Sequence, residues 1–422
     1  MGTQPPPEQG LTAPEEGNSS GAKYPREAIG TSTAYFPAAA ILPVEIEDAE
    51  LTRASKASRT PLKLRVVNGP IPARERSRIL AEYGRLTDRR IPIQTFVRCT
   101  EQSPEGPAIH GLLETSEGLV VGHCCLVPFR MNIGRRRLKV AKAEYFFVSE
   151  GYRSRAVEGL ESSGRPAVVI LLEQLYHYAS QQGWGPLLAS PSQGSQAVHR
   201  QAGCRLVEFR AAECFFVLNP ARAWRRGSNL PAKHRRRLFL AGLAQRALSS
   251  VVLPLTYDAG LVKNPRIGED LPSMGSRDDS RLSLAEAEDF LRWRYPDDAY
   301  SRFVLSDGSP GYAIVQKAGH GDYLRVYQAC APANGRTSSL ITELIRQANW
   351  SRAIGVRWSV YGGGPEQRRM VAQLRKLGFF CVRELRRVAV YTSEPEFLSP
   401  DKWNLSDSVF TLEELYPDPA FT

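Results

Sequence analysis

The chain has 422 residues, of which 42% are hydrophobic, and a formal net charge of +11. The length excludes a single ordinary domain and suggests two or three, while the hydrophobic content is typical of soluble globular proteins. The positive charge predicts an anionic partner without choosing between nucleic acid, a membrane surface and a phosphorylated cofactor. No apolar run approaches the roughly 20 residues that span a bilayer. The first ten residues lack the basic and apolar regions of a secretory signal.

The seven cysteines are scattered along the chain and show no Cys-x-x-Cys pairing. Cys124 and Cys125 are adjacent, so on a strand they face opposite ways and cannot share one metal ion. We therefore interpret all seven cysteines as reduced, mostly buried thiols, and expect a cytoplasmic chain without a metal site. The neighbouring His123 is interpreted as a core or edge histidine.

Residues 1–60 are rich in Pro, Gly, Ser, Thr and Glu, which predicts a disordered tail. A first domain is predicted over residues 61–219. Its opening elements are a strand from Leu62, a helix from Ile71 to Leu86, and three antiparallel strands over Ile109 to Thr115, Leu119 to Pro128 and Phe129 to Val140.

Residues 143–183 predict a strand, a basic loop and a long helix. Tyr145, Phe147 and Val148 carry the strand signal, and apolar residues recur at helical spacing from Val168 until Gly183 stops the helix. Helix N-terminal N–H groups and the helix dipole favour an anion in such a loop. A short strand, a short helix and a closing strand are predicted next, over Leu187 to Ser190, Ser195 to Gln201 and Cys204 to Leu218.

Residues 220–281 are predicted to form a basic linker that includes a helix from Leu238 to Leu248. A second domain is predicted over residues 282–395, with a tail over 396–422. Its predicted elements are a helix from Leu284 to Tyr295, three strands, a polar loop at Asn334-Gly335-Arg336-Thr337, a helix from Ser338 to Ala348, a strand, a helix from Gln367 to Leu377 and a final strand from Val382 to Tyr391.

The two domains therefore repeat one order of elements: strands, polar loop, long helix, strand, short helix, glycine, strand. Their short helices end alike, in Gln201-Ala202-Gly203-Cys204 and Lys376-Leu377-Gly378-Phe379. On this order the chain resembles the GNAT superfamily of acyl-CoA-dependent N-acyltransferases, as a bacterial tandem pair of unassigned substrate. The resemblance implies an α/β (α+β) fold of two GNAT-like lobes, each a mixed, mostly antiparallel sheet flanked by helices.

In that family the loop after the fourth strand holds the pyrophosphate of acetyl-CoA. The resemblance implies acetyl-CoA or another acyl-CoA as co-substrate, with no metal. The alternative to a pyrophosphate-binding loop is a solvated basic loop. Ala156 and Glu158 stand where the family has glycines, which departs from the family pattern. The implied contacts are Val148, Ser149, Tyr152, Arg153, Ser154, Arg155 and Ala156.

His199 stands four residues before Gly203, where many family members have a tyrosine that protonates the departing CoA thiolate. Glu144 on the strand is the implied base for the amine. In the alternative interpretation, His199 is an ordinary polar residue of a short helix and Glu144 is a surface carboxylate. In the second lobe Leu374 occupies the position of the acid, so that lobe is expected to bind substrate or to be structural.

These expectations combine into an N-acyltransferase, most simply an acetyltransferase, acting on a small-molecule or peptide amine. A non-catalytic tandem GNAT-like binding module is one alternative. Another is a twinned transferase that uses aminoacyl-tRNA, which would use the cluster Arg235-Arg236-Arg237 directly. The favoured interpretation of that cluster is the basic side of a linker helix, because no stacking aromatic residues alternate with it.

Overall fold

The computed structural model describes residues 61–400, with gaps at 88–89, 134–135, 227–235, 238, 248–260, 265–281, 285–287, 296–299, 306–311, 317–322, 331–336 and 362–364. The predicted tail over 1–60, Arg235 and most of the polar loop around Asn334 lie outside the described residues. The helices within these ranges include none that is both long and apolar enough to cross a membrane.

The first lobe contains strands β1 to β5 and helices α2 to α5. Antiparallel pairing joins β1 through β4 in order, and β5 pairs parallel with β4. Between β4 and α4 lie two 3-10 turns, Glu150–Tyr152 and Glu161–Ser163, and a third, Gln193–Ser195, precedes α5. The elements are β1 (Lys63–Asn68), α2 (Ala73–Thr87), α3 (Ile93–Glu101), β2 (Ile109–Glu114), β3 (Val120–Ile133), β4 (Arg136–Val148), α4 (Ala167–Gln181), β5 (Leu187–Ala189) and α5 (Gln196–Gln201).

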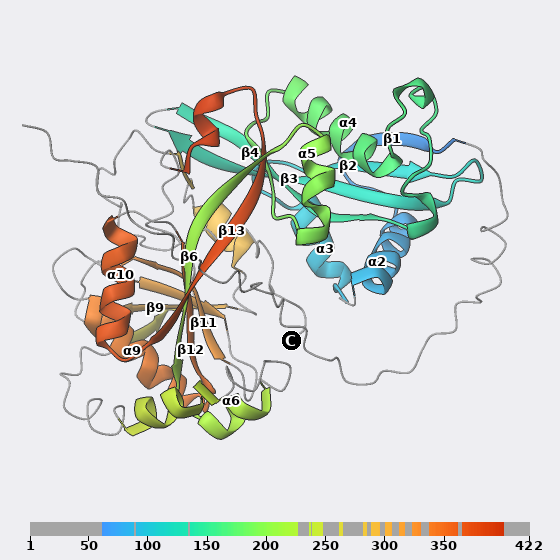
Figure 1. Cartoon of the computed structure of the whole chain (residues 1–422). Helices are drawn as coiled ribbons and strands as arrows, with labels where there is room; N and C mark the ends of the chain where they lie inside the picture. The colour runs from blue at the N-terminus through green and yellow to red at the C-terminus, as the bar shows by residue number, and fades with distance from the viewer. Residues whose placement is uncertain are drawn as a thin grey trace, which may run out of the picture. The chain divides into compact units, whose positions relative to one another are not determined.

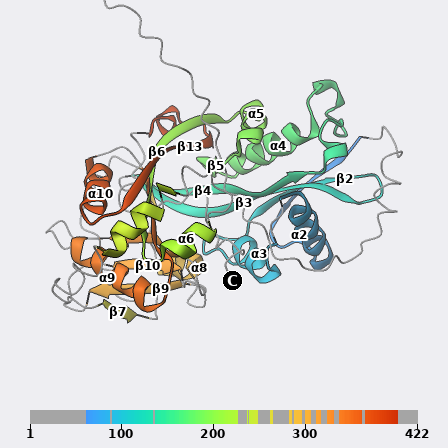
Figure 2. The same ribbon diagram turned by 60° about the horizontal axis from the view of Figure 1, so that its bottom comes forward.

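Helices cover both faces of this sheet: α2 and α3 lie on one side, and α4 and α5 on the other (Figure 2). Alternation of side chains along the strands builds a core on each face. Leu112 and Cys125 pack with Phe96 of α3, whereas Leu113 and Cys124 pack with the apolar side of α4. The neighbours Cys124 and Cys125 thus face opposite ways, as predicted.

Two strands cover residues 119–140, as predicted, but the predicted boundary between them at Pro128 and Phe129 is wrong. β3 runs without a break through Pro128, and the chain turns back only after Ile133. The last residue of β3 that pairs with β2 is Leu126. Pro128 therefore lies beyond the end of β2, where its missing N–H removes no ladder bond to that strand.

The second lobe contains strands β9 to β12 and helices α8 to α10, preceded by α6, β7 and β8. The predicted helix from Leu284 to Tyr295 is wrong at its start, because Leu282–Leu284 forms strand β8 against Met131–Ile133 of β3. The elements are α6 (Pro220–Arg226), β7 (Leu261–Asn264), β8, α8 (Glu288–Arg294), β9 (Tyr300–Leu305), β10 (Tyr312–Gln316), β11 (Tyr323–Cys330), α9 (Thr337–Trp350), β12 (Gly355–Tyr361), α10 (Pro365–Lys376), β13 (Phe380–Tyr391) and a 3-10 turn, Pro395–Leu398.

The two lobes exchange their last strands. β6 (Arg205–Val217) lies between β12 and β13, and β13 lies between β5 and β6. The two exchanged strands run side by side over eleven register pairs, from Phe380 opposite Phe215 to Val390 opposite Arg205 (Figure 1). One sheet of mixed, mostly antiparallel strands therefore runs through both lobes, which confirms the predicted fold class. The domain limits at 219 and 282 stay predictions.

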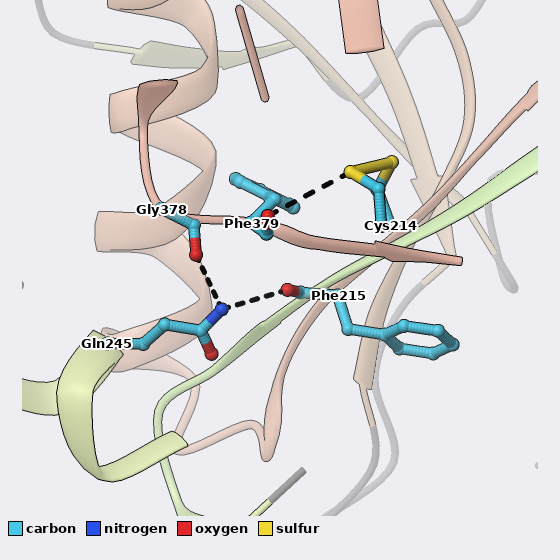
Figure 3. The surroundings of a disulfide bond; sticks show 6 residues. Cys214, Phe215, Gln245, Gly378 and Phe379 are labelled. Atoms are coloured by element: carbon cyan, nitrogen blue, oxygen red, sulfur yellow. Dashed lines mark hydrogen bonds between the residues drawn. A yellow bond between two sulfur atoms is a disulfide. The ribbon is translucent and has the colours of Figure 1, made fainter. Parts of the chain in front are cut away.

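A disulfide joins the exchanged strands. Cys214 of β6 and Cys381 of β13 are register partners, with Cα atoms 4.0 Å apart, and their sulfurs are bonded (Figure 3). The prediction that all seven cysteines are reduced is therefore wrong for this pair, because the sequence alone does not show that residues 167 apart become opposite neighbours. The predicted cytoplasmic location stays a prediction and loses one of its grounds.

Gln245 closes the same junction from a buried position in the helical residues 239–247. Its Nε2 donates to the carbonyl oxygens of Phe215 and Gly378, at 3.1 and 2.6 Å (Figure 3). Its Oε1 accepts from the Val217 backbone N–H at 2.7 Å. One amide thus ties β6 to the turn that starts β13.

Candidate functional site

The parallel strands β4 and β5 diverge at the centre of the first lobe. Their ladder consists of Ala141 opposite Leu187 and Lys142 opposite Leu188. Beyond that point β5 ends at Ala189, while β4 continues to Val148. From Ala143 to Val148, β4 continues past the last residue that pairs with β5.

A bulge in β4 follows the last pair. His123 lies opposite Phe147 and Cys125 opposite Glu144, so β4 holds one more residue than β3 over this stretch. Tyr145 takes up the difference with a φ of 51°, in the left-handed region that side chains other than glycine rarely occupy. The bulge lets Phe146 turn toward α5, while Tyr145 packs among Phe96 and Phe147 on the opposite face.

Glu144 lies two residues beyond the last β4–β5 pair and forms an ion pair with Lys142. The Lys142 Nζ is 2.5 Å from the Glu144 carboxylate, and the side chains are 3% and 18% exposed. Residues two apart on a strand share a face, which brings this pair together. The cation of Lys142 favours the ionised carboxylate that a general base requires. Sequence reasoning selected Glu144 and missed Lys142, although their i, i+2 spacing was visible.

His199 is a buried side chain of α5. Its Nδ1 lies 3.2 Å from the Tyr176 hydroxyl of α4, and its ring meets that of Phe146 edge-on at 5.7 Å between centroids. Burial lowers the pKa of His199 to about 4, so the imidazole is neutral near pH 7. Its role in protonating a thiolate stays a prediction, and that role now has to be performed by the neutral ring.

Tyr391 completes the surroundings of His199 from the exchanged strand β13. Its ring stacks on Tyr176 with centroids 5.3 Å apart. Burial raises the pKa of Tyr391 above its usual value, so its hydroxyl keeps its proton. Sequence reasoning had no signal for this residue, because it lies in the other half of the chain.

The predicted cofactor loop lies between β4 and α4 and is held by its own hydrogen bonds. The Arg153 Nε donates to the Val148 carbonyl at 2.9 Å, and the Arg155 guanidinium lies over the Tyr152 ring, 4.4 Å from its centroid. The Ser149 Oγ donates to Glu82 at 2.6 Å. Ala156 accepts from the Leu62 backbone N–H at 2.9 Å, which fixes the loop to the first strand.

The first N–H groups of α4 already have acceptors in this loop. Ala167 N donates to the Arg155 carbonyl at 3.0 Å, and Val168 N donates to the Arg153 carbonyl at 3.3 Å. In a helix these are the donors that would hold a phosphate. A diphosphate at this position would have to displace both carbonyls or be bound by the two arginine side chains instead.

The second lobe repeats the divergence and the bulge. β11 and β12 pair in parallel from Tyr323 opposite Gly355 to Val326 opposite Trp358. The register of β10 and β11 then shifts by one residue at Tyr327, whose hydroxyl donates to the Gln316 Oε1 at 3.0 Å. Leu374, at the position of the acid, is fully buried in the apolar core. The substrate-binding or structural role of this lobe stays a prediction.

The basic cluster of the linker is described only in part. Arg236 and Arg237 are exposed and helical, and Arg235 lies outside the described residues. The favoured interpretation of the cluster, the basic side of a linker helix, stays a prediction.

No protein-family model matches the sequence, and no curated protein matches it. Several solved structures are similar to this chain. An *Enterococcus faecalis* protein described as a probable N-acyltransferase is 11% identical, with 77% of this chain and 72% of that chain covered and a TM-score of 0.46. A tandem GNAT protein from the clavulanic acid biosynthesis pathway is 14% identical, with 78% and 99% covered and a TM-score of 0.44.

The *Saccharomyces cerevisiae* N-myristoyltransferase with bound myristoyl-CoA is 11% identical, with 79% of this chain and 81% of that chain covered and a TM-score of 0.48. The chain resembles GNAT-type N-acyltransferases. At these identities the likeness is one of arrangement alone, and it assigns no substrate to this chain.

Proposed function

We propose that this chain is an acyl-CoA-dependent N-acyltransferase whose reaction takes place where β4 and β5 diverge. The observation that carries the proposal is the end of the β4–β5 ladder at Lys142 and Leu188, followed at once by the β4 bulge. A strand whose neighbour departs can offer its backbone N–H groups to a ligand carbonyl, as an edge strand does to an added strand. Holding a thioester and an amine together there supplies most of what acyl transfer requires.

In this mechanism Glu144 accepts the proton of the attacking amine, and Lys142 keeps its carboxylate ionised and in place. The amine nitrogen bonds to the thioester carbonyl carbon, and the CoA thiolate leaves with the electron pair of the broken C–S bond. The Tyr176 hydroxyl, which contacts the neutral His199 imidazole, returns a proton to that thiolate. Arg153 and Arg155 supply positive charge toward the diphosphate of CoA, and acetyl is the simplest acyl group.

Isothermal titration with acetyl-CoA tests the binding half of the proposal. The intact chain should bind it, and the double variant Arg153→Ala, Arg155→Ala should bind at least about tenfold more weakly, because two charge-assisted contacts are lost. Arg165→Ala is the matched control, since Arg165 pairs with Glu173 near the same helix terminus. Absence of binding at millimolar acetyl-CoA and myristoyl-CoA would overturn the proposal.

Thiol release tests the chemical half. With a panel of small amines and peptide N-termini, Glu144→Gln should lower turnover about a hundredfold or more and leave acetyl-CoA affinity within about twofold. Equal turnover of Glu144→Gln and the unaltered chain would remove Glu144 from the mechanism.

A second candidate function is a non-catalytic module that binds an acyl-CoA or a protein through the same divergence. The occupied N–H groups of Ala167 and Val168 favour the protein-binding form of this module, because they leave α4 without its usual phosphate donors. Binding of acyl-CoA without release of thiol to any amine of the panel would favour this module over the enzyme.

A further inference from the structure

A cluster of side chains of the kinds that bind metals lies in the first lobe, beside the β4 bulge. His110 of β2 and His123 and Cys125 of β3 are fully buried, and one ligand atom from each lies within 4.8 Å of the others. His123 and Cys125 are two residues apart on one strand, and His110 lies opposite Cys125 in the register, so all three share a face. The ring of Phe96 packs over both histidines, with centroids 6.2 Å away from each.

The hydrogen bonds orient one nitrogen lone pair into this cluster. The His123 Nδ1 lies 3.1 Å from the Tyr145 carbonyl, an acceptor only, so Nδ1 carries the proton and Nε2 carries the lone pair. That Nε2 lies 3.1 Å from the His110 Nδ1. A backbone carbonyl that fixes the tautomer of a histidine in this way is the usual outer contact of a metal-binding imidazole.

We propose that His110 Nδ1, His123 Nε2 and Cys125 Sγ bind a structural Zn²⁺ ion. Two nitrogens on a tetrahedral zinc lie roughly 3.3 Å apart, and a nitrogen and a sulfur roughly 3.6 Å apart. The observed distance between the two nitrogens, 3.1 Å, is close to the value expected on zinc. All three ligand atoms lie within 4.8 Å of one another, so the side chains would have to move by about one ångström to reach tetrahedral geometry. The mixed nitrogen and sulfur donor set favours zinc over the oxygen-preferring Mg²⁺ and Ca²⁺.

A hydrogen-bonded pair of neutral histidines is the alternative for the same side chains. In that alternative the Cys125 thiol donates a weak hydrogen bond to the Glu144 carbonyl, with 3.6 Å between sulfur and oxygen. On zinc the thiol loses its proton, and the thiolate becomes the third ligand. Cys99 of α3 is also buried and would have to move toward these three atoms to take the fourth position.

The ion would act on structure and would not take part in acyl transfer. It would join β2 to β3 and, through the His123 Nδ1–H and the Tyr145 carbonyl, hold the left-handed residue of the β4 bulge. The sequence analysis expected no metal, because it weighed the adjacent Cys124 and Cys125 and not the two histidines on neighbouring strands.

Metal content tests the proposal directly. The full chain is incubated with Zn²⁺ alone, dialysed against metal-free buffer and measured by plasma mass spectrometry. The unaltered chain and Cys124→Ser should each keep about one zinc per chain, whereas Cys125→Ser and His110→Gln should keep less than roughly a tenth of that. Cys124→Ser is the matched control, because Cys124 is equally buried and faces the other core.

Replacement with Co²⁺ in the unaltered chain gives an answer that does not depend on how the variants fold. A thiolate-to-cobalt charge-transfer band should appear and saturate at about one equivalent. An unaltered chain that keeps no zinc and shows no such band would overturn the proposal. So would a Cys125→Ser chain that folds, as judged by circular dichroism, and keeps as much zinc as the control.

Discussion

Cys214 and Cys381 face each other across two strands that the lobes have exchanged, and their disulfide joins the first half of the chain to the second. These two strands, β6 and β13, pair over eleven consecutive residues. The bond therefore closes an arrangement in which each lobe completes its sheet with the last strand of the other.

Removing this disulfide should destabilise the whole chain. A cross-link between residues 167 apart restricts the unfolded chain by roughly 5 kcal/mol in the loop-entropy model. We expect Cys214→Ser with Cys381→Ser to lower the free energy of unfolding by about 3–5 kcal/mol in urea titrations. In denaturant, Cys214 and Cys381 should react with an alkylating reagent only after reduction, whereas Cys204 should react without it.

Lys142 and Glu144 should be strongly coupled in a double-mutant cycle. Lys142→Met leaves a mostly buried carboxylate without its cation and should cost about 3 kcal/mol of stability, while the double variant Lys142→Met, Glu144→Gln should cost clearly less than the sum of the single changes. The exposed pair Arg387 and Glu208 is the control and should show coupling below about 1 kcal/mol. Additive single changes at Lys142 and Glu144 would contradict the burial seen for this pair.

His199 should make stability depend on pH between about 4 and 6.5. Its pKa is lowered to about 4 in the folded chain, so on acidification the unfolded chain takes up this proton first and stability falls with falling pH. The unfolding free energy lost through this difference in pKa amounts to about 3 kcal/mol once the pH has fallen to about 4. His199→Gln should reduce the pH dependence of the unfolding free energy in that window without abolishing it, because burial also lowers the pKa of His123 to about 4. The exposed His177, changed to Gln, should leave it unaltered.

Gly355 should tolerate no side chain. A Cβ there would lie 1.9 Å from the Phe216 carbonyl oxygen of the exchanged strand β6, so Gly355→Ala must push β12 away from β6. We expect a loss of roughly 3 kcal/mol or more in the free energy of unfolding, measured in urea. Gly194→Ala, with open space around its Cβ, should change stability by less than about 0.5 kcal/mol. Equal effects of the two changes would show that β6 and β12 do not pair as described.

Local pattern was enough to predict most of the elements. The helix that begins after the basic loop, its stop at Gly183, and the turns at Gly203 and Gly378 were all predicted from apolar spacing and glycine, and all three glycines have a positive φ. The errors occurred where pairing with a segment far away in the sequence decides which secondary structure forms. Pro128 continues a strand because β2 has already ended, and Leu282–Leu284 is a strand because β3 is there to pair with it.

The candidate site shows the same division. Glu144 and His199 were selected from residue type and position, and the structure places Glu144 beside Lys142 and His199 beside Tyr176. Tyr391 had no sequence signal, because it reaches Tyr176 from the other half of the chain. The hydrogen bonds within the Arg153 loop depend on the backbone conformation of the loop, which its residue types alone do not determine.

The sequence by itself determined the order of strands, loops and helices, since hydrophobic period and turn residues act over a few positions. Only the tertiary structure decided that β6 and β13 change places, that Cys214 meets Cys381, and that His110, His123 and Cys125 converge. These outcomes depend on strand pairing between segments far apart in the chain. Pairing of that kind is set by the packing of whole sheets, which no local pattern records.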